Sequence, residues 1–379
     1  MAKYEESFFC PYRVCPIGAH VDHQYGLITG FAIDKGIEID YTKTPNGKIT
    51  LISKEFGATR EFFIGTHPEK NNDWGDYLRG VLLFLEKNHP LSYGIDAYIK
   101  GSLPVGGLSS SAALCIVFLG AICRANDIKL SKEELINIAF LAETEYVGVR
   151  VGKLDQSCEV LSKKDHLLYL DNKDGSYELI PKNPSMKPFE IGIFFSGVER
   201  TLVGSKFNMR VDELKGAAYA LKAFSGMEYG KFIDTRLRDV PFEVYEKYRS
   251  KLPDNWRKRA EHYYSEFERV QKGSEAWRKG DIEAFGKCSS ESGHSSIYNY
   301  ETGSDELKKL YEIMLETEGI YGGRFSGAGF KGCCMALVNP EFKEEIEYKI
   351  RREYIKAFPK LADKFSVHFT TTSDGVALD

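Results

Sequence analysis

The sequence predicts an α+β protein of two domains, and three observations carry this prediction. The chain has 379 residues, whereas a single domain commonly holds about 100–150. Its first hundred residues alternate β-rich runs with turns, while helical spacing dominates the second half. Because Pro181, Pro184 and Pro188 lie between the two patterns, we place the domains at residues 1–182 and 183–379.

The opening segments read as strands with one helix among them. Residues 31–41, 48–53 and 95–99 are rich in β-branched and aromatic side chains, and Pro-Asn-Gly at 45–47 supplies a turn between the first two runs. Residues 76–87 place apolar side chains at helical spacing. We therefore expect a sheet with a helix packed on it.

The remainder of the first domain is predicted to be mainly helical. Ser131 and Glu134 form a capping box that starts a helix running to about Tyr146. A second helix follows Asp155, and residues 166–171 form a strand before an Asn-Lys-Asp-Gly turn.

The second domain opens with a strand and continues mostly as helices. Residues 189–196 and 334–338 are the predicted strands. Helical spacing is found over residues 209–224, 257–279, 306–316 and 341–356.

Composition excludes several function classes. A net charge of −4 and an isoelectric point near 6.1 argue against a general nucleic-acid binder. Apolar runs fall short of the ~18 residues that a membrane span needs, and the first residues lack the hydrophobic region of a secretory signal. The eight cysteines include no CxxC pair, so we expect mostly buried thiols rather than disulfides or zinc ligands. We expect a cytoplasmic monomer or weak homodimer that binds small molecules.

The segment 101–113, Gly-Ser-Leu-Pro-Val-Gly-Gly-Leu-Ser-Ser-Ser-Ala-Ala, is the most informative stretch. It runs into the apolar residues 112–123, which read as a buried helix. Glycines let the backbone approach a ligand, and free amides at a helix N-terminus attract phosphate. The Lys-Ser/Thr ending of a P-loop is missing. A phosphate site and a Ser-capped helix after a flexible turn are both compatible with these residues.

Two further segments have unusual compositions. Residues 10–26 contain an Arg, two His and an Asp among apolar residues, and residues 324–334 form a glycine-dense loop before a strand. The second segment also suits a simple tight hairpin. Outside them, Glu143 suits a surface pair with Arg150, and Asp155 suits a helix N-cap.

Together these segments resemble the GHMP small-molecule kinases, and within them the galactokinases. The matching parts are the arginine-bearing N-terminal motif, Pro-x-x-Gly-Leu-Ser-Ser-Ser-Ala-Ala, an acidic helix, Leu-Asp-Gln at 154–156 and Phe-Ser-Gly-Ala-Gly-Phe-Lys-Gly-Cys at 325–333. The resemblance covers essentially the whole chain. It implies an N-terminal domain like the second domain of ribosomal protein S5, a ferredoxin-like C-terminal domain, and ATP and sugar bound between them.

The resemblance also implies roles for individual residues. Asp155 would be the catalytic base or orienting carboxylate, with Arg13 beside it, and Mg²⁺ would be held by Ser111 and Glu143. The implied ATP-binding residues are Trp74, Pro104, Gly106, Gly107, Leu108, Ser109, Ser110 and Ser111. Trp74 equally suits a core anchor. The implied substrate-binding residues are Ala19, His20, Asp22, Gly152 and Phe207. Residues 327–332 would support the site by close backbone approach.

One departure from the galactokinase pattern bears on the substrate. Galactokinases have Gly-Glu-His where this chain has Gly18-Ala19-His20, and that Glu contacts the sugar's 6-hydroxyl. Facing a C6 carboxylate, a Glu would place two negative charges about 4 Å apart, which costs on the order of 4 kcal/mol at an effective dielectric constant near 20. Ala19 removes this repulsion. Residues 258–266 and 324–334 also resemble galacturonokinases of plants, so we expect phosphorylation of D-galacturonate at C1.

Other readings remain open at this stage. Phe207 stands where the pattern has a tyrosine, so one expected sugar hydrogen bond is missing. Candidates for pairing the uronate carboxylate are His20, His23, Lys206 and Arg210. The first alternative is a 1-kinase for galactose or another uronate or hexose. The second is a galactokinase-like sensor or regulator that binds ATP and sugar without catalysis, against which the intact Arg13, Glu143 and Asp155 argue.

Overall fold

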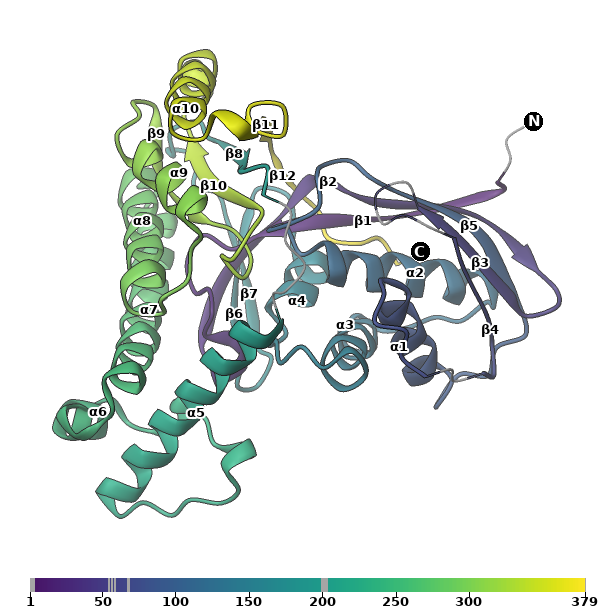
Figure 1. Cartoon of the computed structure of the whole chain (residues 1–379), viewed down its shortest axis with the longest axis horizontal. Coiled ribbons are helices and arrows are strands. Elements are labelled where there is room, and N and C mark those ends of the chain that lie inside the picture. Colours follow the sequence, from purple (N-terminus) through teal and green to yellow (C-terminus); the bar gives the residue numbers. More distant parts are fainter. Residues whose placement is uncertain are drawn as a thin grey trace.

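The computed structural model describes residues 4–378 except positions 54, 56, 58, 67, 68 and 199–203. It contains two sheets with helices packed against each (Figure 1). The strands of the larger sheet are β1 (Glu6–Val14), β2 (Leu27–Thr44), β3 (Lys48–Ser53), β4 (Arg60–Phe63), β5 (Gly94–Gly101), β6 (His166–Asp171), β7 (Tyr177–Pro181) and β12 (Thr372–Ser373). Their order is β4-β3-β5-β2-β6-β7, and both β1 and β12 also pair with β2.

Four helices belong to the half of the molecule that contains the larger sheet. They are α1 (Gly75–Leu85), α2 (Ser110–Ala125), α3 (Lys132–Leu141) and α4 (Leu154–Leu161). Helices α2 and α4 pack on the larger sheet, and α1 and α3 pack on the other helices. Helix α2 is apolar on all sides and nearly every residue in it is buried, which makes it the central helix of this half. The predicted capping box is confirmed, since Ser131 Oγ accepts from Glu134 N at 3.2 Å and Glu134 Oε2 accepts from Ser131 N at 2.9 Å. Helix α3 continues as a π-helical segment, Ala142–Val147, close to the predicted end at Tyr146.

The second sheet has the order β11-β8-β10-β9. Its strands are β8 (Glu190–Phe195), β9 (Ile320–Phe325), β10 (Cys333–Val338) and β11 (Ser366–Thr370). The helices of this half are α5 (Gly204–Ser225), α6 (Phe242–Tyr248), α7 (Asp254–Lys279), α8 (Ile282–Tyr298), α9 (Asp305–Leu315) and α10 (Lys343–Ala357). Helices α7 and α8 run side by side at the left of Figure 1.

The two halves share contacts that position the site. Trp277 of α7 is fully buried, and its Nε1 donates to the carbonyl oxygen of Ile180 in β7 at 3.0 Å. Near the end of the chain, β12 returns to the larger sheet and pairs Thr372 with Ile33 of β2. The boundary between residues 182 and 183 stays a prediction, but the C-terminal tail lies on the first sheet.

Several elements were not predicted from the sequence. Strand β1 coincides with the beginning of the N-terminal motif, and α8 is rich in serine and glycine, which lower helix propensity. Helix α8 forms nonetheless because Asp281 caps it, accepting from Ala284 N at 2.9 Å, and because one of its faces is buried. All eight cysteines are free thiols and all but Cys288 are buried, as predicted. In the described part of the chain, no helix has the length and apolarity of a membrane span.

Candidate active site

An open cleft brings together loops from distant parts of the sequence. Its empty volume, including the part open to solvent, is about 640 Å³. The residues that line it are Arg13, Cys15, Ala19, His20, Asp22, Val149, Val151, Leu154, Asp155, Phe207, Phe325, Gly327 and Ala328. The cleft therefore joins the N-terminal motif, the entrance of α4, the start of α5 and the β9–β10 hairpin.

Arg13 and Asp155 form a partly buried ion pair in the lining of the cleft. Arg13 Nε lies 2.6 Å from Asp155 Oδ1, and the two side chains are 4% and 24% exposed. Burial by itself lowers the pKa of Arg13, but the adjacent Asp155 carboxylate raises it above its ordinary value. Arg13 Nη1 also donates to the Gly107 carbonyl at 3.2 Å. One permanent cation thus connects the acidic side chain to the glycine-rich loop.

The glycine-rich loop before α2 packs backbone to backbone against the β9–β10 hairpin. Gly107 has a φ of +86°, and a Cβ there would lie 2.7 Å from Cys333 Sγ. Gly332 has a φ of +94°, and a Cβ there would lie 2.5 Å from the Gly106 carbonyl carbon. These positions require glycine both for conformation and for space.

The N-terminus of α2 has features of an anion site. Ser109 adopts a left-handed backbone with a φ of 64°, and its Oγ is buried without a hydrogen-bond partner among the described residues. The first amides of α2 follow directly, because the helix begins at Ser110. An unpaired buried hydroxyl beside free amides is a combination that suits a phosphate group.

Glu143 provides a buried carboxylate beside the first turn of α2. Its side chain accepts a hydrogen bond from Gln156 Nε2, and it is 3% exposed. Burial raises the pKa of Glu143 to about 7, while hydrogen bonds from Ser111 and Gln156 act in the opposite direction. A carboxylate and a hydroxyl are oxygen ligands of the kind that Mg²⁺ takes when phosphates complete its coordination. No group of three or more His, Cys, Asp or Glu side chains that could hold a metal is present among the described residues.

The N-terminal motif contributes several further residues to the lining of the cleft. Ala19 is 7% exposed and His20 is 5% exposed, and both line it. Asp22 lies against Gly152, where a Cβ would be 2.5 Å from Asp22 Oδ2. Burial and the charge of Asp155 raise the pKa of Asp22 to about 6. Phe207 is buried in the wall of the cleft and offers only an apolar ring.

Three of the simpler interpretations of the sequence are wrong. Asp155 lies within the first turn of α4, and the N-cap of that helix is two positions earlier. Glu143 is buried, and Arg150 pairs with Asp212 instead. Ser109 occupies the N-cap position of α2, but its side chain makes no capping hydrogen bond. Asp155 and Ser109 therefore do not cap their helices through their side chains, and Glu143 does not form a surface ion pair with Arg150.

None of the predicted ATP-binding residues is among the residues that line this cleft. Trp74 is half-buried at the start of α1 and packs against the core, and the Arg60 guanidinium is 5.5 Å from its ring centre. Leu108 is fully buried, and Pro104 is exposed. The core-anchor interpretation of Trp74 is compatible with these contacts.

Comparison with known proteins agrees with this geometry. Residues 76–163 match the family model of the GHMP kinases N terminal domain, and residues 274–356 match that of the GHMP kinases C terminal domain. The chain is 39% identical over 377 residues to the galacturonokinase of Arabidopsis thaliana, covering 94% of this chain and 88% of that protein. The chain belongs to the GHMP kinases.

Other members of the GHMP kinases are also similar along the whole chain. The galactokinase of Roseiflexus sp. (strain RS-1) is 32% identical, over 97% of this chain and 91% of that protein. The crystal structure of Lactococcus lactis galactokinase complexed with galactose superposes with a TM-score of 0.89 at 25% identity, covering 99% of this chain and 95% of that one. The mevalonate kinase of Methanococcus jannaschii, at 15% identity, has the same fold with a TM-score of 0.68 and covers 99% and 100% of the two chains. The predicted two-domain GHMP kinase fold is confirmed.

Sequence reasoning missed part of the cleft of this GHMP kinase. Val149, Val151 and Phe325 line it as apolar walls, and Cys15 lies beside Arg13. No local pattern marks the valines, because they follow the π-helical segment in a loop. His262 and Glu266 were also unassigned, although their spacing of four residues places them on one face of a helix.

Proposed function

We propose that the protein transfers the γ-phosphoryl group of ATP to the anomeric hydroxyl of D-galacturonate, releasing galacturonate 1-phosphate, ADP and a proton. The observation that carries this proposal is Ala19 in the wall of the cleft, where galactokinases have a glutamate. The similarity to a protein named galacturonokinase supports the same substrate. Membership of the GHMP kinases supports phosphoryl transfer from ATP.

Asp155 is proposed to receive or orient the proton of the anomeric hydroxyl. Its Oδ1 is held by Arg13 Nε, and no other hydrogen bond to its carboxylate is present among the described residues. The second oxygen can therefore face a hydroxyl in the cleft. Arg13 keeps a fixed positive charge beside the point where the transferring phosphoryl group gains negative charge.

The ATP phosphates are proposed to lie on the loop that precedes α2. Gly106 and Gly107 permit close backbone approach, and Ser109 has an unpaired buried hydroxyl. Ser111 and Glu143 would hold Mg²⁺, which would neutralise negative charge on the ATP phosphates when it is bound. The other proposed contacts with ATP are those of Trp74, Pro104, Leu108 and Ser110.

The sugar is proposed to lie between Asp155 and the N-terminal motif. Asp22 would accept hydrogen bonds from ring hydroxyls, and Gly152 leaves it the space to do so. His20 Nε2 is buried without a hydrogen-bond partner among the described residues, so it can interact with the C6 side. Ala19 adds no negative charge there. Phe207 packs against the ring without a hydrogen bond.

The decisive experiment is coupled ADP release with MgATP across D-galacturonate, D-glucuronate, D-galactose and D-glucose. Phosphorus NMR then identifies the phosphorylated carbon. Selective turnover of galacturonate to an anomeric phosphate is the expected result. Turnover mainly of galactose would refute the substrate assignment and favour a galactokinase, which the similarity to galactokinases keeps as the second candidate.

The same assay separates the kinase from a non-catalytic sensor. Binding of ATP and sugar without turnover of any sugar would favour the sensor and contradict the roles given to Arg13 and Asp155. A cytoplasmic location and a monomeric or weakly dimeric state remain predictions of the sequence.

A further inference from the structure

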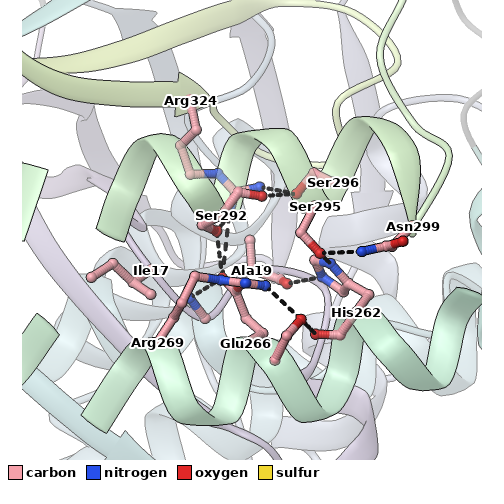
Figure 2. Close-up of polar contacts among 12 residues, drawn as sticks. Ile17, Ala19, His262, Glu266, Arg269, Ser292, Ser295, Ser296, Asn299 and Arg324 are labelled. Carbon is pink, nitrogen blue, oxygen red and sulfur yellow. Dashed lines mark hydrogen bonds and ion pairs between the residues drawn. The ribbon is translucent and has the colours of Figure 1, made fainter. Parts of the chain in front are cut away.

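The backbone of the N-terminal motif is held from the second half of the chain. Gly18 N donates to Glu266 Oε1 at 2.7 Å, and the Ala19 carbonyl oxygen lies 3.0 Å from His262 Nε2. Figure 2 shows both side chains extending from one helix toward Ala19 and toward the facing helix. His262 and Glu266 are one turn apart on α7, and both are fully buried. Because these bonds are to main-chain groups, they do not depend on which side chain stands at position 19.

The neighbours of His262 determine which of its two ring nitrogens donates a hydrogen bond and which accepts one. Burial lowers the pKa of His262 to about 4, so the ring is neutral and carries one N–H. The Ala19 carbonyl can only accept, so Nε2 carries the hydrogen. Nδ1 then accepts from Ser295 Oγ at 2.9 Å, and Ser295 Oγ accepts from Asn299 Nδ2 at 3.2 Å. This chain of donors fixes the tautomer and the orientation of the imidazole.

Glu266 provides a second anchor next to the first. Arg269 Nε lies 2.7 Å from its Oε2, and Ser292 Oγ donates to its Oε1. Burial alone would raise the pKa of Glu266, but nearby positive charges, Arg269 foremost, lower it to about 2. Arg324 Nη1 donates to Ser292 Oγ at 2.5 Å and lies 3.8 Å from Glu266 Oε1. The carboxylate is therefore ionised, partnered and immobile.

The residue that follows these anchors has an unfavourable backbone conformation. His20 has a φ of 65°, in the left-handed region that non-glycine residues seldom adopt. Such a conformation persists when surrounding contacts over-determine it. The bonds to Gly18 and Ala19 supply those contacts, together with the stacking of the His20 ring on Tyr300 at 4.4 Å. His20 in turn lines the cleft.

We propose that His262 is a positioning residue for sugar binding: through the Ala19 carbonyl it holds Ala19 and His20 in the orientation that the sugar requires. The identity of the sugar rests on the function proposed above, but the positioning role does not. His262 itself does not line the cleft. Its loss should therefore weaken sugar binding without changing the phosphate loop.

The test compares His262→Phe with His262→Gln. Phe keeps an aromatic ring but leaves the buried Ala19 carbonyl unpaired, whereas the Gln amide can still donate to it. For the sugar that the parent phosphorylates best, we expect His262→Phe to raise KM by about tenfold or more, with the KM for MgATP changed less than about twofold. His262→Gln should restore most of the sugar affinity.

A matched control lies two residues further along α7. Tyr264→Phe removes a hydrogen bond of 2.9 Å to the Val240 carbonyl and leaves the hydrogen bonds to Gly18 and Ala19 in place. It should change neither the KM for the sugar nor the KM for MgATP selectively. Equal losses of sugar and ATP affinity in a folded His262→Phe protein, or an unchanged KM for the sugar, would overturn the proposal. So would failure of His262→Gln to restore binding.

A second variant and a second measurement cover the cases in which His262→Phe does not fold or the parent protein is inactive. If His262→Phe does not fold, Ser295→Ala removes the donor to Nδ1 and should weaken sugar binding in the same selective way, whereas an unchanged sugar affinity refutes the positioning role. Sugar affinity is also measured by calorimetry. If the parent protein binds a sugar without phosphorylating it, the kinase proposal is refuted, but the effect of the His262 variants on sugar binding can still be measured.

Discussion

Ala19→Glu is the substitution that tests the substrate assignment most directly. Ala19 lines the cleft, its carbonyl oxygen is held by His262, and the amide nitrogen of the preceding Gly18 is held by Glu266. The backbone therefore cannot easily turn a new side chain away from the sugar. With carboxylates about 4 Å apart at an effective dielectric constant near 20, the repulsion is about 4 kcal/mol, or roughly a thousandfold in affinity.

The assay compares kcat/KM for galacturonate and galactose in the parent, Ala19→Glu and Ala19→Gln. Glutamine has nearly the size of glutamate but no charge, so it separates crowding from repulsion. We expect Ala19→Glu to lose about a thousandfold on galacturonate, and Ala19→Gln to lose much less. On galactose, which has no C6 charge, Ala19→Glu should be far less impaired.

Two outcomes would refute this reasoning. Equal losses on galacturonate in Ala19→Glu and Ala19→Gln would mean that size at position 19 matters and charge does not. Full retention of galacturonate activity in Ala19→Glu would mean that the C6 carboxylate does not face this position.

Three further predictions concern carboxyl groups, two of which line the cleft while the third is buried in α4. Asp155→Asn should lower turnover by about a hundredfold or more while calorimetry still detects MgATP binding, and unimpaired turnover would contradict the role of Asp155. The pKa of Asp22 is raised to about 6, so Asp22 loses its ionised, hydrogen-bond-accepting form as pH falls through that value. We therefore expect kcat/KM for the sugar to decline below about pH 6 in the parent protein. A profile that is flat between about pH 5 and 7 would argue against this role of Asp22. Glu159 in α4 is fully buried, and both its oxygens lack hydrogen-bond partners among the described residues. Burial raises the pKa of Glu159 well above its ordinary value, so the folded state keeps a proton that the unfolded state releases, and stability is lost as pH rises. Glu159→Leu should therefore raise the free energy of unfolding, measured with denaturant, by about 1 kcal/mol or more. The gain should be larger at about pH 8 than at about pH 5. Equal gains at both pH values would show that Glu159 does not titrate in this way.

The sequence by itself determined the helices with strong local signals, and it predicted a chemistry for the motifs. The glycines and serines at 106–111 indicate a phosphate loop, because backbone freedom and hydroxyl groups are properties of the residues themselves. The capping box at Ser131 and the apolar spacing of residues 257–279 predict helices because both signals depend only on residues that are close in the sequence. Their helices lie where they were predicted.

Only the tertiary structure decided which of these residues meet and how they are charged. Arg13 and Asp155 are 142 residues apart, and Gly18 and Glu266 are 248 apart, so no local pattern could pair them. The serine-rich helix α8 forms against its propensity because packing on its neighbours favours it. The raised pKa of Asp22 and the lowered pKa of His262 follow from burial, which depends on the whole fold. Propensity and periodicity act over a few residues, whereas burial and ion pairing are set by segments that meet only when the chain has folded.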